Sequence, residues 1–365
     1  MQISWHNNSF LHLDYPLLFG LLLLFAIGLL TLYSAGGQNL DLIFRQILRF
    51  LVGFGILLLL AQIRTQKIVS FVPWVYMFGI LLLLLVLIMG ESTNGSQRWI
   101  NLGLFRFQPS EIMKLAVPLM VAWYLTSKPL PPTSWRLLVA LTIIFIPVFL
   151  VIKQPDLGTS LLIAASGMFV LLLAGLSWRT IFGFISLTVL STPILWHYVL
   201  HEYQRERIRI LLNPERDPAG AGYHIIQSKI AIGSGGFSGK GWLNGTQSHL
   251  QFLPERSTDF IFAVYSEELG LLGVLVLLAI YFFVLSRGMY IALKAQDSFA
   301  RLLAGSLTLT VFVYIFVNMG MVSGLLPVVG LPLPLISYGG TSLVTLMAGF
   351  GLIMAIHTHR RLLSD

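Results

Sequence analysis

Long apolar stretches, separated by short polar connections, run along almost the whole chain. An α-helix needs about 17 to 25 mainly apolar residues to cross about 30 Å of hydrocarbon. The chain has ten such stretches, and the pattern therefore predicts an all-α polytopic membrane protein with ten transmembrane helices in a single domain, residues 1–365. The predicted spans are 16–34, 44–62, 68–89, 109–126, 136–152, 158–175, 178–199, 260–285, 299–322 and 342–358.

The composition agrees with a lipid bilayer as the main solvent. Hydrophobic residues make up 56% of the chain and charged residues only 10%, whereas a soluble domain carries about 25% charged residues. This excludes a soluble globular enzyme. The chain has no Cys, which excludes disulfides, thiolate metal sites and Cys nucleophiles. Acid–base chemistry therefore falls mainly to the 15 Asp and Glu residues.

The positive-inside rule orients the predicted spans, because Lys and Arg of short loops remain in the cytoplasm. Ten of these cations lie in the even-numbered loops and the C-terminus, against four in the short odd-numbered loops. Both termini are therefore predicted to be cytoplasmic, and the long polar segment 200–259 is predicted to be the fourth extracytoplasmic loop. The ten are Arg64, Lys67, Lys128, Arg136, Arg179, Arg287, Lys294, Arg301, Arg360 and Arg361; the four are Arg45, Arg98, Arg106 and Lys153.

Two ionisable residues stand at the predicted outer start of the fourth span. Glu111 and Lys114 follow Gln108 and Ser110, and their spacing of three places them on one helical face. Charges at membrane depth usually face a cavity or one another. The structural alternative is an ordinary helix start, with Ser110 as the cap and an intrahelical Glu111–Lys114 pair.

Two further charged residues are predicted on the same side of the membrane. Asp156 lies in the tight turn between the fifth and sixth spans, where it caps the sixth span or joins Glu111 and Lys114 in a polar site. Arg98 precedes Trp99 at the outer interface. Taken alone, that pair is an ordinary aromatic anchor.

The long external segment carries two further patterns. A helix over 201–212 sets Arg205 and Arg209 on one side, which suits lipid phosphates or, equally, a solvated surface helix. Six glycines follow within 233–245, but their spacing fits neither a phosphate-binding loop nor the G-x-G-x-x-G template. ATP-driven work is therefore not expected.

The eighth span carries three acids. Asp259 stands where the polar loop becomes a membrane helix, which is also the usual place of a capping residue. Glu267 and Glu268 lie about 12 Å deeper. A span with three acids should border a polar cavity rather than lipid. The last external loop, 323–341, is uncharged and broken by three prolines, and we expect it to be re-entrant, with its backbone buried in protein or facing water.

Several long, ordered motifs resemble those of the SEDS family of bacterial cell-wall polymerases, and the resemblance covers nearly the whole chain. The motifs are Gln97-Arg98-Trp99, Gln108-Pro109-Ser110-Glu111 with Lys114, Gln154-Pro155-Asp156-Leu157-Gly158-Thr159, the glycine-rich run from Gly233 to Gly245, Phe252 to Phe262, Glu267-Glu268, Pro332-Leu333-Pro334 and Ser337-Tyr338-Gly339-Gly340.

The resemblance implies a peptidoglycan glycosyltransferase that polymerises lipid II during cell elongation and rod-shape maintenance, with Asp259 as the essential acid and general base. It implies a bacterial inner-membrane location, a class B penicillin-binding protein transpeptidase and other elongation-complex membrane proteins as partners, and no nucleic acid. A divalent cation, Mg or Mn, near Glu111 and Asp156 is left open. The expected substrate-binding residues are Arg98, Gln108, Ser110, Glu111, Lys114, Asp156, Arg205, Arg209 and Glu267.

Two other functions fit the same pattern. Ten spans with charges inside the membrane and a lipid-accessible groove also suit a transporter that flips lipid II. A non-catalytic scaffold of the elongation complex is the third hypothesis. Transbilayer movement of labelled lipid II distinguishes the first of these from a polymerase, and a scaffold has neither activity.

Overall fold

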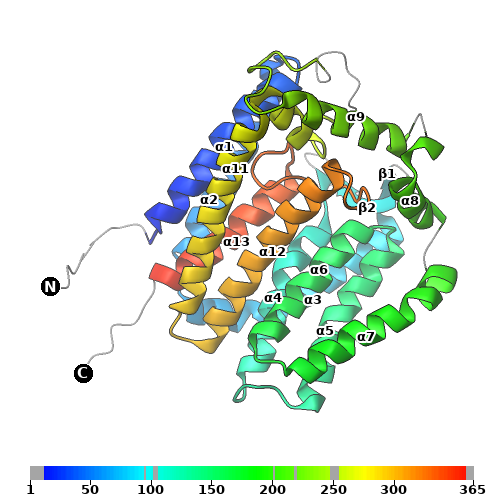
Figure 1. Ribbon diagram of the computed structural model, residues 1–365. Helices are drawn as coiled ribbons and strands as arrows, with labels where there is room; N and C mark the ends of the chain where they lie inside the picture. The colour runs from blue at the N-terminus through cyan, green and yellow to red at the C-terminus, as the bar shows by residue number, and fades with distance from the viewer. Residues whose placement is uncertain are drawn as a thin grey trace.

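The computed structural model shows a bundle of long helices with a cap of shorter elements at one end (Figure 1). It describes residues 12–93, 96–101, 106–199, 202–217, 220–246 and 255–358. Arg360 and Arg361, which entered the orientation count, and Phe252 to Pro254 of the quoted motif lie outside these residues. The membrane-type helices are α1 (Tyr15–Ala35), α2 (Leu40–Ala61), α3 (Thr65–Met89), α4 (Pro109–Thr126), α5 (Ser134–Lys153), α6 (Leu157–Leu173), α7 (Trp178–Ile194), α11 (Ile261–Leu293), α12 (Ser298–Val322) and α13 (Thr341–Thr358).

Every predicted span coincides with a helix. Seven of them, α1, α2, α3, α5, α11, α12 and α13, are long and apolar enough to cross a membrane. The 18 residues of α4 include Glu111 and Lys114, which lower its hydropathy. Helices α6 and α7 have 17 residues each, and a π-helix, η1 (Leu195–Val199), extends α7. The number of ten crossings stays a prediction, while the helical content of all ten stretches is confirmed.

The prediction of a purely helical fold was incomplete, because a small antiparallel sheet lies between α3 and α4. Its strands are β1 (Glu91–Thr93), β2 (Ser96–Asn101) and β3 (Arg106–Phe107), in the order β1-β2-β3. Ser92 lies opposite Gln97, and Ile100 lies opposite Phe107. Strands this short are stabilised by their neighbours, here the adjoining helices α3 and α4.

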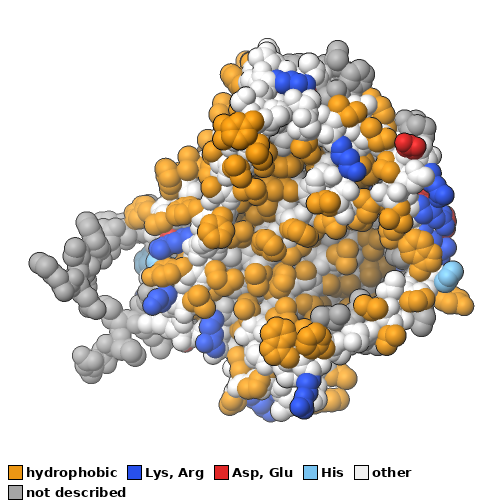
Figure 2. All heavy atoms as spheres, viewed as in Figure 1, with side chains coloured by type: hydrophobic (Ala, Val, Ile, Leu, Met, Phe, Trp, Pro, Cys, Tyr) orange, Lys and Arg blue, Asp and Glu red, His pale blue; other side chains and the backbone are white. Residues whose placement is uncertain are grey.

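The core lies where α12, α13, α4 and α6 meet. α13 packs along α2, α11 packs between α1 and α12, and α4 contacts α3, α5, α6 and α12. The outer helices turn large apolar side chains such as Phe19, Trp74 and Ile88 outward. Figure 2 shows hydrophobic side chains over most of one face, with Lys and Arg gathered towards its margins. Such a surface is expected where lipid is the solvent.

The external segment is more ordered than a simple polar loop. It contains α8 (Glu202–Leu212), the 3₁₀ helix η2 (Pro214–Arg216) and α9 (Ala221–Gly235). The predicted helix over 201–212 is thus confirmed. Figure 1 shows α8 and α9 at the upper end of the bundle, above α6 and α12.

Helix α11 is broken at Gly270, whose φ is 62°. The break removes the usual bonds between the carbonyls of Glu267 and Glu268 and the amides four residues later. The glycine-rich segment 235–241 supplies partners for all four groups: the amides of Lys240 and Gly241 donate to the two carbonyls, at 3.1 and 2.9 Å, and the amides of Leu271 and Leu272 donate to carbonyls of the segment, at 3.0 and 3.1 Å. The glycine-rich segment therefore completes a broken helix.

The last connection, residues 323–340, has no helix or strand, as its prolines predict. Its central residues Leu331, Leu333 and Leu335 are buried. The Tyr281 hydroxyl donates to the carbonyl of Pro334 at 2.7 Å, and the amide of Leu333 donates to the Ser337 hydroxyl at 2.7 Å. The middle of this irregular connection is thus buried in protein, and its re-entrant course stays a prediction.

Candidate functional site

Asp259 lies in a short turn just before α11. The N-cap of α11 is Phe260, without a side-chain capping bond, so the interpretation of Asp259 as a helix cap is wrong. The Asn318 amide of α12 donates to the backbone carbonyl of Asp259 at 3.0 Å and to that of Leu331 at 2.7 Å. A Cβ added to Gly330 would lie 3.5 Å from Asp259 Oδ2. Asn318 therefore fixes the turn that carries Asp259 against the last connection.

The carboxylate of Asp259 has the electrostatics of a base. It accepts no hydrogen bond within the part of the chain that the structure describes. Burial and the neighbouring Glu255 raise the pKa of Asp259 to about 6, while Arg207 opposes this shift. A general base works best when its pKa lies close to the operating pH. Asp259 is ionised at neutral pH and still basic enough to accept a proton.

A second polar cluster joins β2, the start of α4 and the start of α6. Asp156 is the N-cap of α6, and its Oδ1 accepts from the amide of Thr159 at 3.2 Å, which confirms the predicted cap. Its Oδ2 accepts from Gln108 Nε2 at 3.2 Å and lies 3.7 Å from Arg98 Nε. Gln108 also donates to the Ser110 hydroxyl at 3.1 Å. Asp156 thus both caps α6 and belongs to the polar cluster.

The N-cap of α4 is Gln108, without a side-chain capping bond, so the expected role of Ser110 as the cap is wrong. Pro109 occupies the first helical position and Ser110 the second. Ser110 is buried and faces Gln108 within the cluster.

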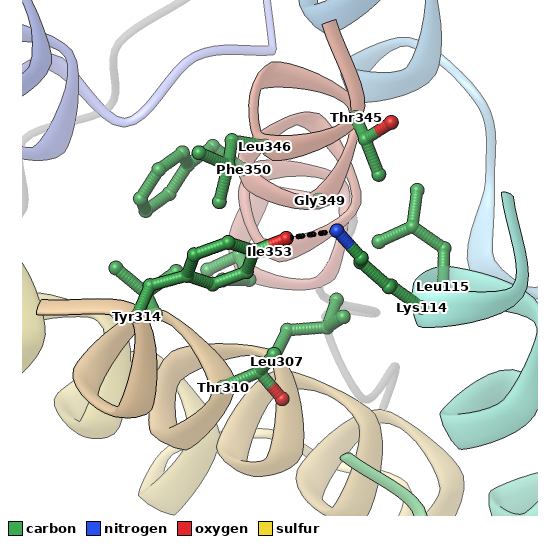
Figure 3. Close-up of a pocket in the computed structure, with 11 residues that line it drawn as sticks. Lys114, Leu115, Leu307, Thr310, Tyr314, Thr345, Leu346, Gly349, Phe350 and Ile353 are labelled. Atoms are coloured by element: carbon green, nitrogen blue, oxygen red, sulfur yellow. Dashed lines mark hydrogen bonds between the residues drawn. The ribbon is translucent and has the colours of Figure 1, made fainter. Parts of the chain in front are cut away.

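Glu111 and Lys114 form the predicted pair inside the bundle. Lys114 Nζ donates to Glu111 Oε1 at 2.7 Å and to the hydroxyl of Tyr314 on α12 at 2.5 Å. Figure 3 shows the ammonium and the phenol pointing towards one another from α4 and α12, in a mostly apolar pocket that α13 also lines, with Phe350 among its residues. Glu111 Oε2 is buried without a hydrogen-bond partner among the described residues. The pair is therefore both an intrahelical ion pair and part of a buried polar site.

The Asp156 cluster and the Asp259 turn both approach the last connection. A Cβ added to Gly158, two residues into α6, would lie 2.7 Å from the carbonyl oxygen of Val329. Gly330, the next residue, lies beside Asp259 Oδ2. The start of α6, with Asp156, and the catalytic candidate Asp259 thus approach the same two residues of the connection.

Arg205 and Arg209, which were predicted to face lipid phosphates, instead form ion pairs with acids of their own helix, α8. Arg209 Nη1 lies 2.6 Å from Glu202 Oε1 and 3.1 Å from Glu206 Oε2. Arg205 Nη1 lies 3.3 Å from Glu202 Oε2. These cations are therefore largely neutralised. Arg207 acts on Asp259 instead, and it lies about 200° around α8 from both Arg205 and Arg209.

Glu267 and Glu268 are buried among structural partners. Glu267 Oε1 lies 2.7 Å from Lys240 Nζ and accepts from the Thr246 hydroxyl at 3.0 Å. Glu268 accepts from the hydroxyl of Ser34 on α1. Glu267 thus packs against Lys240 of the glycine-rich segment, and substrate binding by Glu267 stays a prediction.

The residues near Glu111 and Asp156 do not fit a divalent cation. Lys114 already places a positive charge 2.7 Å from Glu111 Oε1, and Gln108 and Arg98 approach Asp156. Within the described residues, no three His, Cys, Asp or Glu side chains gather where they could hold a metal ion. No chemical step is therefore assigned to a metal here.

Sequence reasoning missed Asn318, Tyr314 and Arg207. Asn318 and Tyr314 are the polar groups of the stretch 311–322 of α12, which is otherwise apolar, and a polar side chain at membrane depth is itself a signal of function. Both are uncharged, so the high cost of a charge at membrane depth does not reveal them. Arg207 stands in the sequence between Arg205 and Arg209, but the direction of its side chain depends on how α8 packs.

The fold and the site define a polytopic helical membrane protein with a buried acidic and basic site beneath an extramembrane cap. The chain belongs to the FtsW/RodA/SpoVE family, whose model, described as "Cell cycle protein", matches residues 7–362.

Characterised relatives agree with this assignment. The chain is 55% identical over 353 residues to the peptidoglycan glycosyltransferase MrdB of Escherichia coli K12, covering 97% of this chain and 95% of the relative. It is 39% identical over 302 residues to MrdB of Helicobacter pylori 26695, covering 78% and 77%.

Solved structures agree with the fold. One chain, from work described as "Structural coordination of polymerization and crosslinking by a peptidoglycan synthase complex", matches with a TM-score of 0.83 and 34% identity, covering 94% of this chain and 97% of the other. The rod shape determining protein RodA of Thermus thermophilus matches with a TM-score of 0.73 and 28% identity, covering 96% and 98%.

Proposed function

We propose that this chain is a peptidoglycan glycosyltransferase that polymerises lipid II at the outer face of the cytoplasmic membrane during cell elongation and rod-shape maintenance, with Asp259 as the general base. The enzyme class rests on the family and on the 55% identity to a named glycosyltransferase. The observation that carries the residue assignment is the Asp259 carboxylate, which caps no helix and has a pKa raised to about 6.

The reaction joins an acceptor sugar to a lipid-linked donor. The acceptor hydroxyl oxygen forms a bond to the anomeric carbon, its proton passes to Asp259, and the bond from that carbon to the lipid diphosphate breaks. A base with a pKa of about 6 accepts the proton as the hydroxyl becomes a nucleophile. The diphosphate is already an activated leaving group, so the reaction needs no ATP.

Negative charge develops on the leaving diphosphate, and preset cations stabilise it. Arg207 near Asp259 and Arg98 beside Asp156 are the candidates best placed for this role. The Arg98 side chain is 31% exposed, whereas that of Lys114 is 4% exposed. Arg98 can thus meet a substrate directly, while Lys114 acts through Glu111 and Tyr314.

A class B penicillin-binding protein transpeptidase is the proposed partner, within a complex of other elongation membrane proteins. A structural neighbour comes from a peptidoglycan synthase complex that coordinates polymerization and crosslinking. Both termini of this chain are proposed to lie in the cytoplasm, and the α8–α9 cap outside, where lipid II is consumed.

Replacement of the base tests the proposal. Asp259→Asn, purified with its partner and supplied with lipid II, should lose about 100-fold or more of its polymerisation rate, the usual contribution of a general base. Asp297→Asn, a change at an exposed carboxylate outside this cluster, is the matched control and should keep full activity. Glycan chains resolved on gels are the readout, and complex formation checks folding.

Continued polymerisation by Asp259→Asn at the control rate would disprove its role as the base. Transbilayer movement of labelled lipid II in vesicles, without glycan chains, would instead favour the flippase hypothesis. Neither activity from the folded wild-type complex would favour a scaffold.

A further inference from the structure

An apolar groove lies at the opposite end of the bundle from Asp259. Asp14, just before α1, lies 2.8 Å from Arg287 near the end of α11 and 2.8 Å from His357 at the end of α13. These three helix ends therefore meet at the end of the bundle that carries both chain termini. The groove lies where α11 ends and α12 begins.

The groove is apolar except for one side chain. Leu130 from the α4–α5 connection, Leu173 at the end of α6, and Met289 and Leu293 of α11 contribute to its walls. Its volume is about 470 Å³. This is within the range, about 300 to 1,000 Å³, of small-molecule sites. Arg301, in the first turn of α12, is the charged residue of the lining.

Arg301 has no acidic partner among the described residues. Its side chain is exposed and makes neither an ion pair nor a side-chain hydrogen bond with any residue that the structure describes. Two further exposed cations, Lys128 and Lys294, lie next to lining segments in sequence. Asp297, four residues before Arg301, is the nearest acid in the chain and forms no ion pair with it.

We propose that this groove binds an anionic phospholipid, with the phosphate at Arg301 and an acyl chain along the apolar walls. The ligand must be apolar at one end and anionic at the other, because the groove is apolar and its charge is an unpaired cation. A phospholipid of the surrounding leaflet has this form. By the positive-inside count this is the cytoplasmic leaflet, where basic residues meet anionic lipid.

A transmembrane helix of another protein fits the groove less well. Such a helix would need an acid to meet Arg301, at a considerable cost of burial in the membrane. A lipid phosphate brings its charge at interfacial depth, where it stays partly hydrated. The inference is independent of the proposed glycosyltransferase activity.

Lipid binding to the full-length protein tests the proposal. The detergent-purified chain is titrated with phosphatidylglycerol or with phosphatidylcholine of the same acyl chains, and native mass spectrometry counts the bound lipid. Wild type should prefer phosphatidylglycerol, and Arg301→Gln should bind it about five-fold more weakly, the effect of one Arg near an anionic surface. Arg179→Gln, an exposed Arg outside the groove lining, should bind as wild type does.

A photo-crosslinking residue at Leu293, which is 72% exposed, gives a second measurement in the membrane that keeps Arg301 unchanged. It should crosslink to lipid in vesicles containing phosphatidylglycerol. Equal binding of both lipids, equal loss in Arg301→Gln and Arg179→Gln, or crosslinks to polypeptide in native membranes would each overturn the proposal.

Discussion

At Asp259, two neighbouring charges act in opposite directions on one carboxyl group. Burial raises its pKa first, Glu255 raises it further, and Arg207 lowers it. A charge inside a membrane protein is costly, so the sequence has only 15 acids, and each could be considered as a candidate base. The surroundings of Asp259 could not be predicted, because Arg207 lies on α8, and the packing of α8 fixes the direction of the Arg207 side chain.

The acid limb of the pH profile should therefore move in opposite directions in two variants. Glu255→Gln removes a negative charge, stabilises the Asp259 carboxylate and lowers its pKa, so activity should persist to lower pH. Arg207→Gln removes a positive charge, raises the pKa and moves the limb to higher pH. Each shift should be about half a pH unit, as for a partly screened charge near a protein surface.

The measurement is kcat/KM for glycan polymerisation between about pH 5 and 8, which reports the free enzyme's ionisations. Wild type should lose activity as the pH falls through about 6, because the base becomes protonated. Shifts of the same sign in both variants, or none in either, would show that Asp259 is not the titrating group.

At the scale of elements, α11 and the glycine-rich segment form one structural unit. The apolar pattern correctly predicts a helix from about residue 260, and the sequence itself shows the glycine run of 233–245. It does not show that the two segments join, because an isolated Gly is tolerated within a helix. The four groups freed at Gly270 are bonded by residues about 30 positions earlier, which no local pattern reveals.

Two glycines of this region should differ sharply when replaced by Ala. Gly239 has φ +79°, and a Cβ there would lie 2.1 Å from the carbonyl oxygen of Glu268, so Gly239→Ala should destabilise the protein. The expected cost is about 1 to 3 kcal/mol. Gly233 lies in α9 with nothing within 4 Å of an added Cβ, and Gly233→Ala should be neutral or stabilising. Thermal unfolding in detergent compares them, and equal midpoints would refute the role of Gly239.

At the scale of the whole molecule, the bilayer made most of the fold predictable. Apolar stretches of spanning length have few alternatives to helices, and all ten became helices. The Glu111–Lys114 pair was also predicted, because a spacing of three places both residues on one helical face. The small sheet, the helical cap and the contacts of Asn318 depend on packing between distant segments, which hydropathy does not encode.

The orientation of the bundle remains a prediction, and the absence of Cys makes it directly testable. Ser238 lies in the glycine-rich segment and Ser127 follows α4 at the other end, and both are exposed. If the positive-inside count holds, Ser238→Cys should react with a membrane-impermeant maleimide in intact spheroplasts. Ser127→Cys should react only after lysis. The reverse pattern would place both termini outside, and Asp259 would then face the cytoplasm, away from the site of wall assembly.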